Sequence, residues 1–303
     1  MTSPDTEVIN QRQGVGRSER IGPEASGPAI APGFGPDLAR LRELSTAIPG
    51  RPPTAVNGVK FAASIRPRKF VVEGSDDRPV TMPRTAFQVV YQDRSIMLDA
   101  GMDRETHDSF GEGEPFDADA FARLVRALDW ASLIVLTHYH ADHVAGVLRA
   151  PNFAALARKT LATTHTLDFL VNKPHRPHLK LNEAEARRFI IFDYADLMPI
   201  APGLVLIKAP GHSPDMQMAF IRLGSGQEIL HSVDAAWNLA NVQGVKGKAA
   251  PWVKEDGAAV MSQLRWLKQV TESEPDLALI ITHDGELFDD LARRGVIGTE
   301  LAA

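Results

Sequence analysis

The chain has 303 residues, of which 44% are hydrophobic and 23% charged, and its formal net charge is −5. This is the composition of a globular protein long enough for one large or two small domains, and the acidic balance gives no indication of nucleic acid binding. Because the chain has no apolar run near the ~20 residues of a membrane span, no signal-peptide core and no cysteine, we expect a cytoplasmic protein without membrane contact, disulfides or thiolate metal ligands.

The first 53 residues differ from the rest and are predicted to form an N-terminal arm. Between Gly14 and Pro36, ten of 23 residues are Gly or Pro, a density that sustains neither a helix nor a strand. A short helix is predicted over residues 36–48, with Asp37 near its start. Its apolar stripe consists of Leu38, Leu41, Leu44 and Ile48. The stripe suits docking on the main domain or on a second subunit, as in a homodimer, and a plain linker is the alternative.

Residues 54–303 are predicted to form one layered α/β domain, because strands alternate with helices along them. Residues 86–101 are expected to form a hairpin that turns near residues 92–94. Residues 117–130 are expected to form a helix with one apolar face. Further strands are predicted over residues 131–138, 204–212, 216–223 and 228–234, a helix over 257–270, and a last buried strand over 277–285.

Four metal-binding side chains crowd into the segment LTHYHADHVAGV, residues 136–147. His138 and His140 follow an apolar strand and are two residues apart, so in extended backbone both side chains point the same way. Asp142 and His143 fall where the chain turns into a helix. One pair can therefore face one ion and the second pair another, and imidazole and carboxylate ligands suit zinc and similar divalent metals.

The segment HYHADH matches the HxHxDH motif of the metallo-β-lactamase superfamily, and four more segments resemble that family in the family order. Upstream, IMLDAGM resembles the strand-ending segment that carries an aspartate, here Asp99. Downstream, APGHSPD resembles the loop of the third histidine, HSVDAAW that of the bridging acid and LIITHDG that of the last ligand. These three segments give His212, Asp234 and His283. The resemblance covers most of residues 54–290.

The resemblance implies a four-layer αββα sandwich, in which two mixed sheets face each other and helices cover the outside. It implies two metal ions, with zinc as the first choice and iron, manganese or cobalt as alternatives. A water molecule bound between two ions ~3.5–4 Å apart would have a pKa of ~7, and the hydroxide that it forms would be the nucleophile. Asp142 and Asp234 would be the catalytic carboxylates, and Asp99 would orient a ligand histidine. The implied ligands are His138, His140 and His212 for one ion, and Asp142, His143 and His283 for the other, with Asp234 as the bridge.

An aspartate at the bridging position resembles lactonases, glyoxalase II-type thioesterases and nucleases rather than true β-lactamases. The charge and length disfavour a nuclease, and the short tail after His283 lacks the basic extension that glyoxalase II-type enzymes use for glutathione. We therefore expect a hydrolase of carboxylic esters that acts on a small lactone, similar to the N-acyl homoserine lactonases. A glyoxalase II-type thioesterase is the alternative, followed by a non-hydrolytic metal-binding member.

One position departs from the lactonase pattern. These enzymes commonly have a tyrosine three residues after the bridging aspartate, where this chain has Trp237. An indole donates one hydrogen bond but cannot act as a phenol-type acid. Trp237 is expected to form a wall for an acyl chain or to pack in the core, and Tyr139 is a second candidate for contact with substrate. The segment KPHRPHLK, with His175 and His178, is expected to be an ordinary surface loop, with the substrate entrance as the alternative.

Overall fold

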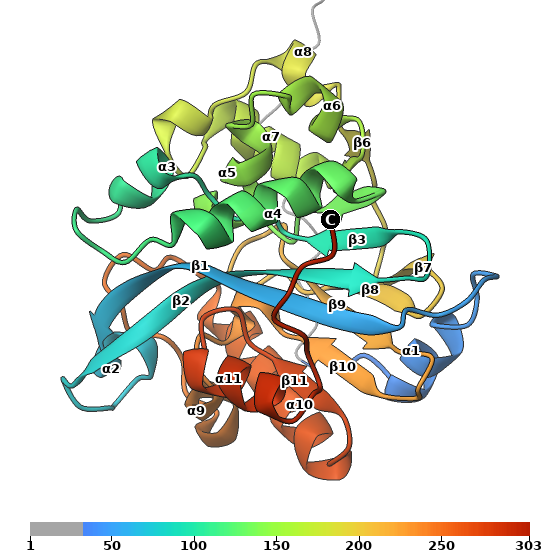
Figure 1. Ribbon diagram of the computed structural model, residues 1–303. Helices are drawn as coiled ribbons and strands as arrows, with labels where there is room; N and C mark the ends of the chain where they lie inside the picture. The colour runs from blue at the N-terminus through green and yellow to red at the C-terminus, as the bar shows by residue number, and fades with distance from the viewer. Residues whose placement is uncertain (1–32) are drawn as a thin grey trace, which may run out of the picture.

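The computed structural model describes residues 33–303. Two mixed β-sheets pack face to face, and helices cover their outer faces (Figure 1). The predicted four-layer αββα sandwich is therefore confirmed. Residues 1–32, which hold most of the predicted Gly/Pro-rich arm, lie outside the described part of the chain. Within residues 33–303, no helix is long and apolar enough to cross a membrane.

The two sheets have six and five strands in the described residues. The first sheet has the order β1-β2-β3-β4-β5-β6 and the second β11-β10-β9-β8-β7. The first sheet consists of β1 (Ala55–Pro67), β2 (Pro79–Val90), β3 (Ser95–Leu98), β4 (Leu133–Val135), β5 (Thr160–Ala162) and β6 (Ile190–Ile191). The second consists of β7 (Leu197–Ala201), β8 (Leu204–Lys208), β9 (Gln217–Arg222), β10 (Glu228–His231) and β11 (Ala278–Ile280).

Helices flank both sheets, with α3 to α8 on the side of the first sheet and α9 to α11 on the side of the second (Figure 1). Their bounds are α1 (Leu38–Leu44), α2 (Arg68–Val71), α3 (Arg104–Asp108), α4 (Ala118–Trp130), α5 (Ala141–Leu148), α6 (Phe153–Ala157), α7 (Thr164–Asn172), α8 (Glu183–Ala186), α9 (Leu239–Gly244), α10 (Gly257–Ser273) and α11 (Gly285–Arg293). Short 3₁₀ turns span Pro177–Leu179 and Val233–Ala235.

The predicted hairpin and the two predicted long helices are present. β2 and β3 pair antiparallel and turn between Val90 and Ser95, as expected. Helix α4 begins after Asp117, whose side chain accepts a hydrogen bond from Ala120 N, and it buries Leu124 and Leu128 against the first sheet. Asp256 caps α10 in the same way through Ala259 N. Each helix is therefore fixed by a side-chain cap at its start and an apolar face along its length.

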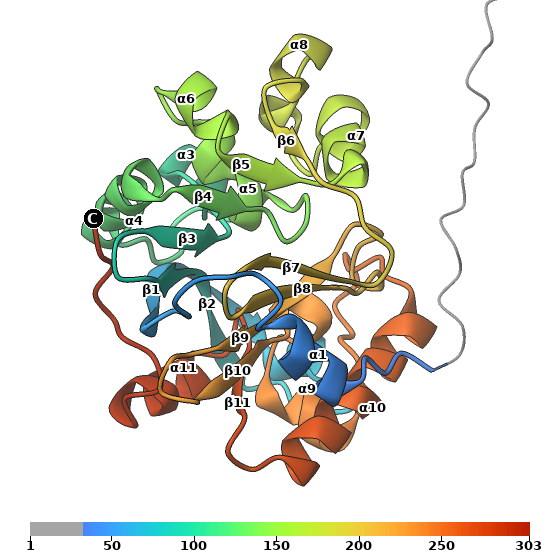
Figure 2. The same cartoon turned by 90° about the vertical axis from the view of Figure 1, so that its right-hand side faces the viewer.

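Helix α1 docks on the second sheet and α10 rather than forming a free linker (Figure 2). Leu41 is fully buried, and Trp266 Nε1 of α10 donates a hydrogen bond to Pro36 O. The Arg42 guanidinium binds Glu228 through two nitrogens and also reaches Glu274. Part of the predicted arm thus packs on the main body, and the domain boundary at residues 53/54 stays a prediction.

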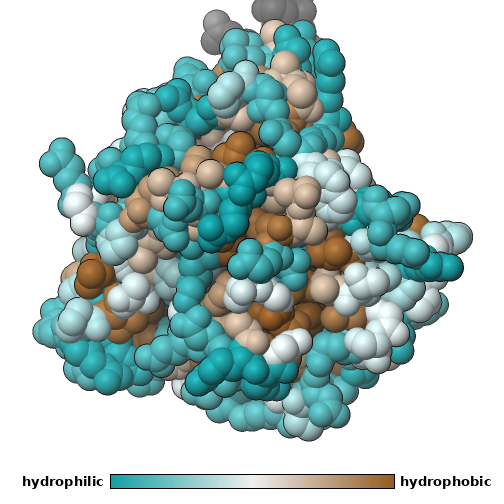
Figure 3. Space-filling view, viewed as in Figure 1, coloured by the Kyte–Doolittle hydropathy of each residue, from teal (hydrophilic) through white to brown (hydrophobic). Residues whose placement is uncertain are grey.

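Several strands end at one edge of the sandwich, and this edge positions the candidate site. β3 and β4 run parallel in the first sheet. β10 and β11 run parallel in the second, and β8 shares their direction because β9 is antiparallel to both neighbours. The loops that follow these strands carry the predicted ligands. Hydrophilic residues cover most of the outer face seen in Figure 3.

Candidate metal centre

Three histidine nitrogens converge beyond the ends of β4 and β8. His138 Nε2 lies 3.0 Å from His140 Nδ1, which lies 3.0 Å from His212 Nε2. The three side chains offer nitrogen atoms that all lie within 4.8 Å of one another. An ion with metal–nitrogen bonds of about 2.0–2.1 Å brings its ligand atoms into this range. The first predicted ligand group is therefore assembled in the structure.

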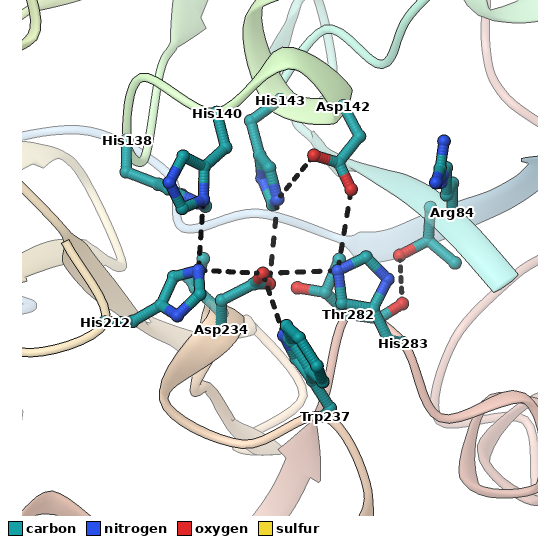
Figure 4. Close-up of polar contacts among 12 residues, drawn as sticks. Arg84, His138, His140, Asp142, His143, His212, Asp234, Trp237, Thr282 and His283 are labelled. Carbon is teal, nitrogen blue, oxygen red and sulfur yellow. Dashed lines mark hydrogen bonds and ion pairs between the residues drawn. The ribbon is translucent and has the colours of Figure 1, made fainter. Parts of the chain in front are cut away.

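The second predicted group lies beside the first. His283 Nε2 is 3.6 Å from Asp142 Oδ2, and His143 Nε2 is 3.9 Å from Asp142 Oδ1. Asp142 and His143 start helix α5, while His283 follows β11 of the other sheet. The centre is thus built from both sheets (Figure 4).

Asp234 lies between the two groups. Its Oδ2 atom is 3.4 Å from His212 Nε2 and 3.2 Å from His283 Nε2, and its Oδ1 atom is 3.6 Å from His143 Nε2. The preceding residue, Val233, has φ of 51°, which is rare for a β-branched side chain. This strained turn aims the Asp234 carboxylate into the centre, where a single carboxylate can serve two ions.

The unpartnered buried atoms of the centre fit a bound cation. His143 Nε2 and Asp234 Oδ1 are buried and make no hydrogen bond in the described residues. Such atoms are normally satisfied, so each needs a partner that the protein does not supply. A divalent ion accepts electron pairs from both atoms, and a set of five imidazoles and two carboxylates suits zinc, iron, manganese or cobalt.

Hydrogen bonds from behind fix the orientation of the ligand imidazoles. Asp99, with φ of 67°, accepts hydrogen bonds from Thr137 N and Oγ1, and its Oδ2 lies 2.7 Å from His143 Nδ1. His283 Nδ1 donates to Pro83 O at 2.8 Å. When Nδ1 carries the hydrogen, Nε2 is left to face the metal. Asp99 therefore lies where the sequence placed it, behind a ligand histidine.

The ionisation of the side chains around the centre favours the binding of a cation. Burial, with neighbouring histidines, lowers the pKa of His138 and His140 well below the usual range, so both rings are neutral donors. Burial opposes ionisation of Asp234, but His283 and His143 hold the pKa of its carboxyl well below the usual range. Against its burial, the pKa of His143 is raised by Asp99 and two further carboxylates. The surrounding carboxylates thus stabilise a positive charge at the His143 ring, which a bound proton or a metal ion can supply.

Two residues that the sequence did not indicate support His212. Glu255 Oε2 lies 3.1 Å from His212 Nδ1 and 2.8 Å from Lys248 Nζ. The Lys248 side chain is 1% exposed, and its ammonium also donates to Asp234 O at 2.6 Å. Both residues lie in the irregular segment between α9 and α10, which has no motif that could have revealed them. The pair connects this segment to the His212 ring and to the backbone of Asp234.

Trp237 and Tyr139, the predicted substrate contacts, have different surroundings. Trp237 is 8% exposed, and its Nε1 donates a hydrogen bond to Asp234 Oδ2 at 3.1 Å. Its ring packs with Val71, Val72, Met82 and Ala250. Tyr139 is half-buried, stacks on Phe169 with ring centroids 4.2 Å apart and touches His140 edge-on. Trp237 thus holds the Asp234 carboxylate, while Tyr139 borders the accessible side of the centre.

The expectation of an ordinary surface loop is wrong for His175. Its Nδ1 accepts a hydrogen bond from Ala141 N, and its ring lies 4.6 Å from the His140 ring between centroids. Burial lowers the pKa of His175 to about 4, so the ring is neutral near pH 7 and Nε2 keeps its hydrogen. His178 is bound to Thr106 Oγ1 at 2.9 Å. The segment therefore lies against the metal centre.

No family model matches the chain, but known proteins with a similar sequence are found. N-acyl homoserine lactonases of Bacillus thuringiensis and its subspecies kurstaki are 26% identical over 155 residues, or 50% of this chain. The aligned part is 56% of each relative, so the chain spans about half the length of the curated relatives it matches. The chain thus resembles N-acyl homoserine lactonases in sequence.

Solved structures extend the likeness over most of the chain. An N-acyl homoserine lactone hydrolase with N-hexanoyl-L-homoserine at its catalytic metal centre is 18% identical with a TM-score of 0.61, covering 79% of this chain and 96% of that one. A dizinc quorum-quenching lactonase is 16% identical with a TM-score of 0.56, covering 77% and 91%. A hydrolase of the β-lactamase superfamily is 14% identical with a TM-score of 0.54, covering 79% and 92%. The chain has the metallo-β-lactamase fold.

Proposed function

We propose that the chain is a di-metal hydrolase of carboxylic esters whose substrate is a lactone similar to an N-acyl homoserine lactone. The observation that carries the proposal is Asp234, whose carboxylate contacts histidines of both ligand groups. A carboxylate shared in this way offsets the repulsion between two divalent ions. The resemblance to lactonases supports a lactone over a thioester.

Two divalent ions, zinc by first choice, supply an acidic water and polarise the carbonyl under attack when they are bound. The protein's part is to position seven metal-ligand side chains. Those of His140 and Asp142 are half-buried, and the other five are buried. Substrate therefore approaches from the side of these two residues. Asp142, whose side chain is 15% exposed, is the catalytic carboxylate placed to exchange a proton with the substrate. Asp234, at 4%, holds the two groups together.

The substrate contacts follow from the same geometry. Tyr139 lies beside the accessible His140 and offers its ring and hydroxyl to the part of the substrate next to the carbonyl. The Trp237 ring is steeply inclined to the rings of His212 and His283, at 70° and 88°, with centroids 6.1 Å away in both cases. We assign Trp237 first to positioning Asp234, and its apolar face to an acyl chain.

A substrate panel on metal-replete protein tests the proposal. Lactones with short and long acyl chains, aryl esters, thioesters and β-lactams are compared by kcat/KM, with Asp234→Asn as the inactive reference. Lactones are expected to give the highest value. A higher value for thioesters would favour the glyoxalase II-type alternative. Hydrolysis of none of them would contradict the proposal and favour a non-hydrolytic metal protein.

A further inference from the structure

Two arginines lie near the accessible side of the candidate metal centre, where the predicted ligands His140 and Asp142 are partly exposed. His140 and Asp142 are the two predicted ligands with partial exposure, and both face the loop that holds His175 and Arg176. The Arg176 guanidinium lies 3.7 Å from the centre of the Phe110 ring. The Arg84 guanidinium lies 4.7 Å from the same ring. Two arginines from distant parts of the sequence thus both pack on the Phe110 ring.

Among the residues that the structure describes, Arg84 is a buried cation without an ion pair. It is 6% exposed and projects from β2 toward the side of Asp142, with no contact drawn between them (Figure 4). Its nitrogens bind three neutral atoms: Ser64 Oγ at 2.8 Å, His107 Nδ1 at 3.2 Å and Met102 Sδ at 3.5 Å. In residues 33–303, no carboxylate oxygen lies within 4.0 Å of the Arg84 nitrogens. Five N–H donors are therefore served by three partners.

The nearby carboxylates are already engaged. Glu114 forms an ion pair with Arg66, and Asp108 with Arg104. Burial lowers the pKa of Arg84, while the charges of Asp142 and Glu114 raise it. Asp142 is also a predicted metal ligand, so a bound ion would neutralise its negative charge and leave less of it to balance Arg84. An uncompensated buried charge is costly, and a ligand anion would supply the missing partner.

Arg176, the second guanidinium against Phe110, also has unused donors in the described residues. Its Nε donates to Ser109 Oγ and one terminal nitrogen donates to His175 O, which leaves the other terminal nitrogen free in the described residues. Burial lowers the pKa of Arg176, and among its neighbours Asp142 alone raises it. Both arginines thus have Asp142 as a charged neighbour and N–H groups to spare.

We infer that Arg84 and Arg176 form a subsite for a carboxylate that the substrate carries apart from the bond that is cleaved. The planar guanidinium matches a carboxylate through parallel hydrogen bonds, which a neutral group cannot equal. The inference rests on the proposed function and narrows its substrate class to lactones or esters with a free carboxylate. Hydrolysis of a lactone also releases a carboxylate. The experiment must therefore separate binding of the substrate's own carboxylate from binding of the carboxylate that forms when the ring opens.

A matched pair of lactones provides the test. Metal-replete protein is assayed with γ-butyrolactone-γ-carboxylate and with the uncharged γ-carboxamide of the same ring. We expect a KM at least about tenfold lower for the carboxylate, the effect of one charge-assisted hydrogen bond. Arg84→Met and Arg176→Met are expected to remove this difference, because each raises the KM of the carboxylate more than the KM of the carboxamide. Arg104→Met is the control, because Arg104 is exposed and paired with Asp108.

Each other outcome has a defined meaning. Equal KM values for the two lactones in wild type would overturn the inference and leave the proposed function intact. If only inhibition by 4-hydroxybutyrate, the acid from neutral γ-butyrolactone, depends on the arginines, the subsite binds product and the inference is wrong. If neither lactone is hydrolysed but calorimetry shows arginine-dependent binding of the γ-carboxylate, the subsite stands and the proposed function fails. Arg176→Met, on a half-buried loop, decides these cases if Arg84→Met does not fold.

Discussion

Replacing Glu255 with glutamine is expected to weaken metal binding by the first histidine group and to destabilise the protein. Glu255 Oε2 is 3.1 Å from His212 Nδ1 and 2.8 Å from Lys248 Nζ. Its side chain is 9% exposed and that of Lys248 is 1% exposed, so water replaces little of what is lost. Glutamine keeps the size and one acceptor oxygen but removes the negative charge.

The magnitude follows from the two contacts. Breaking a buried ion pair costs about 3–5 kcal/mol. Because Lys248 keeps its hydrogen bond to Asp234 O at 2.6 Å, we expect the lower end, about 3 kcal/mol of unfolding free energy. Loss of a carboxylate behind a metal-binding histidine lowers metal affinity ~10–100-fold. At about 1.4 kcal/mol per factor of ten, this corresponds to about 1.4–2.8 kcal/mol of binding free energy.

Two measurements separate these effects. Competition with a chromophoric chelator gives the zinc affinity, and denaturant unfolding of metal-free protein gives the stability. Combining Glu255→Gln with Lys248→Met is expected to restore much of the stability, because no unpaired charge remains, but not the zinc affinity. Glu183→Gln, in an exposed pair with Arg187, is the control. Wild-type zinc affinity in Glu255→Gln would refute the role of Glu255 behind His212.

Three further predictions concern the centre itself. Purified active protein should contain close to two divalent ions per chain, and chelation should abolish hydrolysis; elemental analysis that gives one ion in active protein would contradict the two-metal proposal. Asp234→Asn should lower kcat by orders of magnitude and weaken binding of one ion, whereas Asp99→Asn should cost only ~10–100-fold, and equal activity of Asp234→Asn and wild type would exclude the bridge. Trp237→Phe keeps an aromatic ring but removes the N–H donor to Asp234, so zinc affinity should fall ~10-fold while the ranking of acyl chain lengths is unchanged; a changed ranking with unaltered zinc affinity would instead assign Trp237 to the substrate.

The predicted ligands could be found from the sequence because each lies a few residues after a strand, in a segment that resembles one of a known family. Apart from Asp99, their supporting contacts could not be found in this way. His283 is oriented by the backbone carbonyl of Pro83, from the middle of β2, and no side-chain pattern encodes such a contact. Glu255 reaches His212 from a segment with no periodicity. Both contacts depend on how the two sheets pack, which lies beyond local sequence.

The longest strand illustrates the same limit. β1 runs from Ala55 to Pro67, but its burial pattern does not alternate, since much of both faces is covered. Gly58 is the fourth of its 13 residues, and a glycine inside a strand usually weakens it. In the structure, a Cβ at Gly58 would lie 2.7 Å from a Phe288 ring carbon and 2.8 Å from one of Phe87. The glycine is needed for ring packing between layers, a reason visible only after the layers are assembled.

Trp237 shows how the structure changes an interpretation that the sequence left open. The sequence offered an acyl-chain wall or core packing, and the structure adds a hydrogen bond from the single indole N–H to Asp234. Because an indole has no second donor, Trp237 has none left for a substrate carbonyl. A donor to the substrate must then come from the accessible side of the centre, where His175 keeps a hydrogen on Nε2 and Arg176 has a free nitrogen. We therefore expect substitutions in the loop from Lys173 to Lys180, rather than at Trp237, to alter substrate preference most.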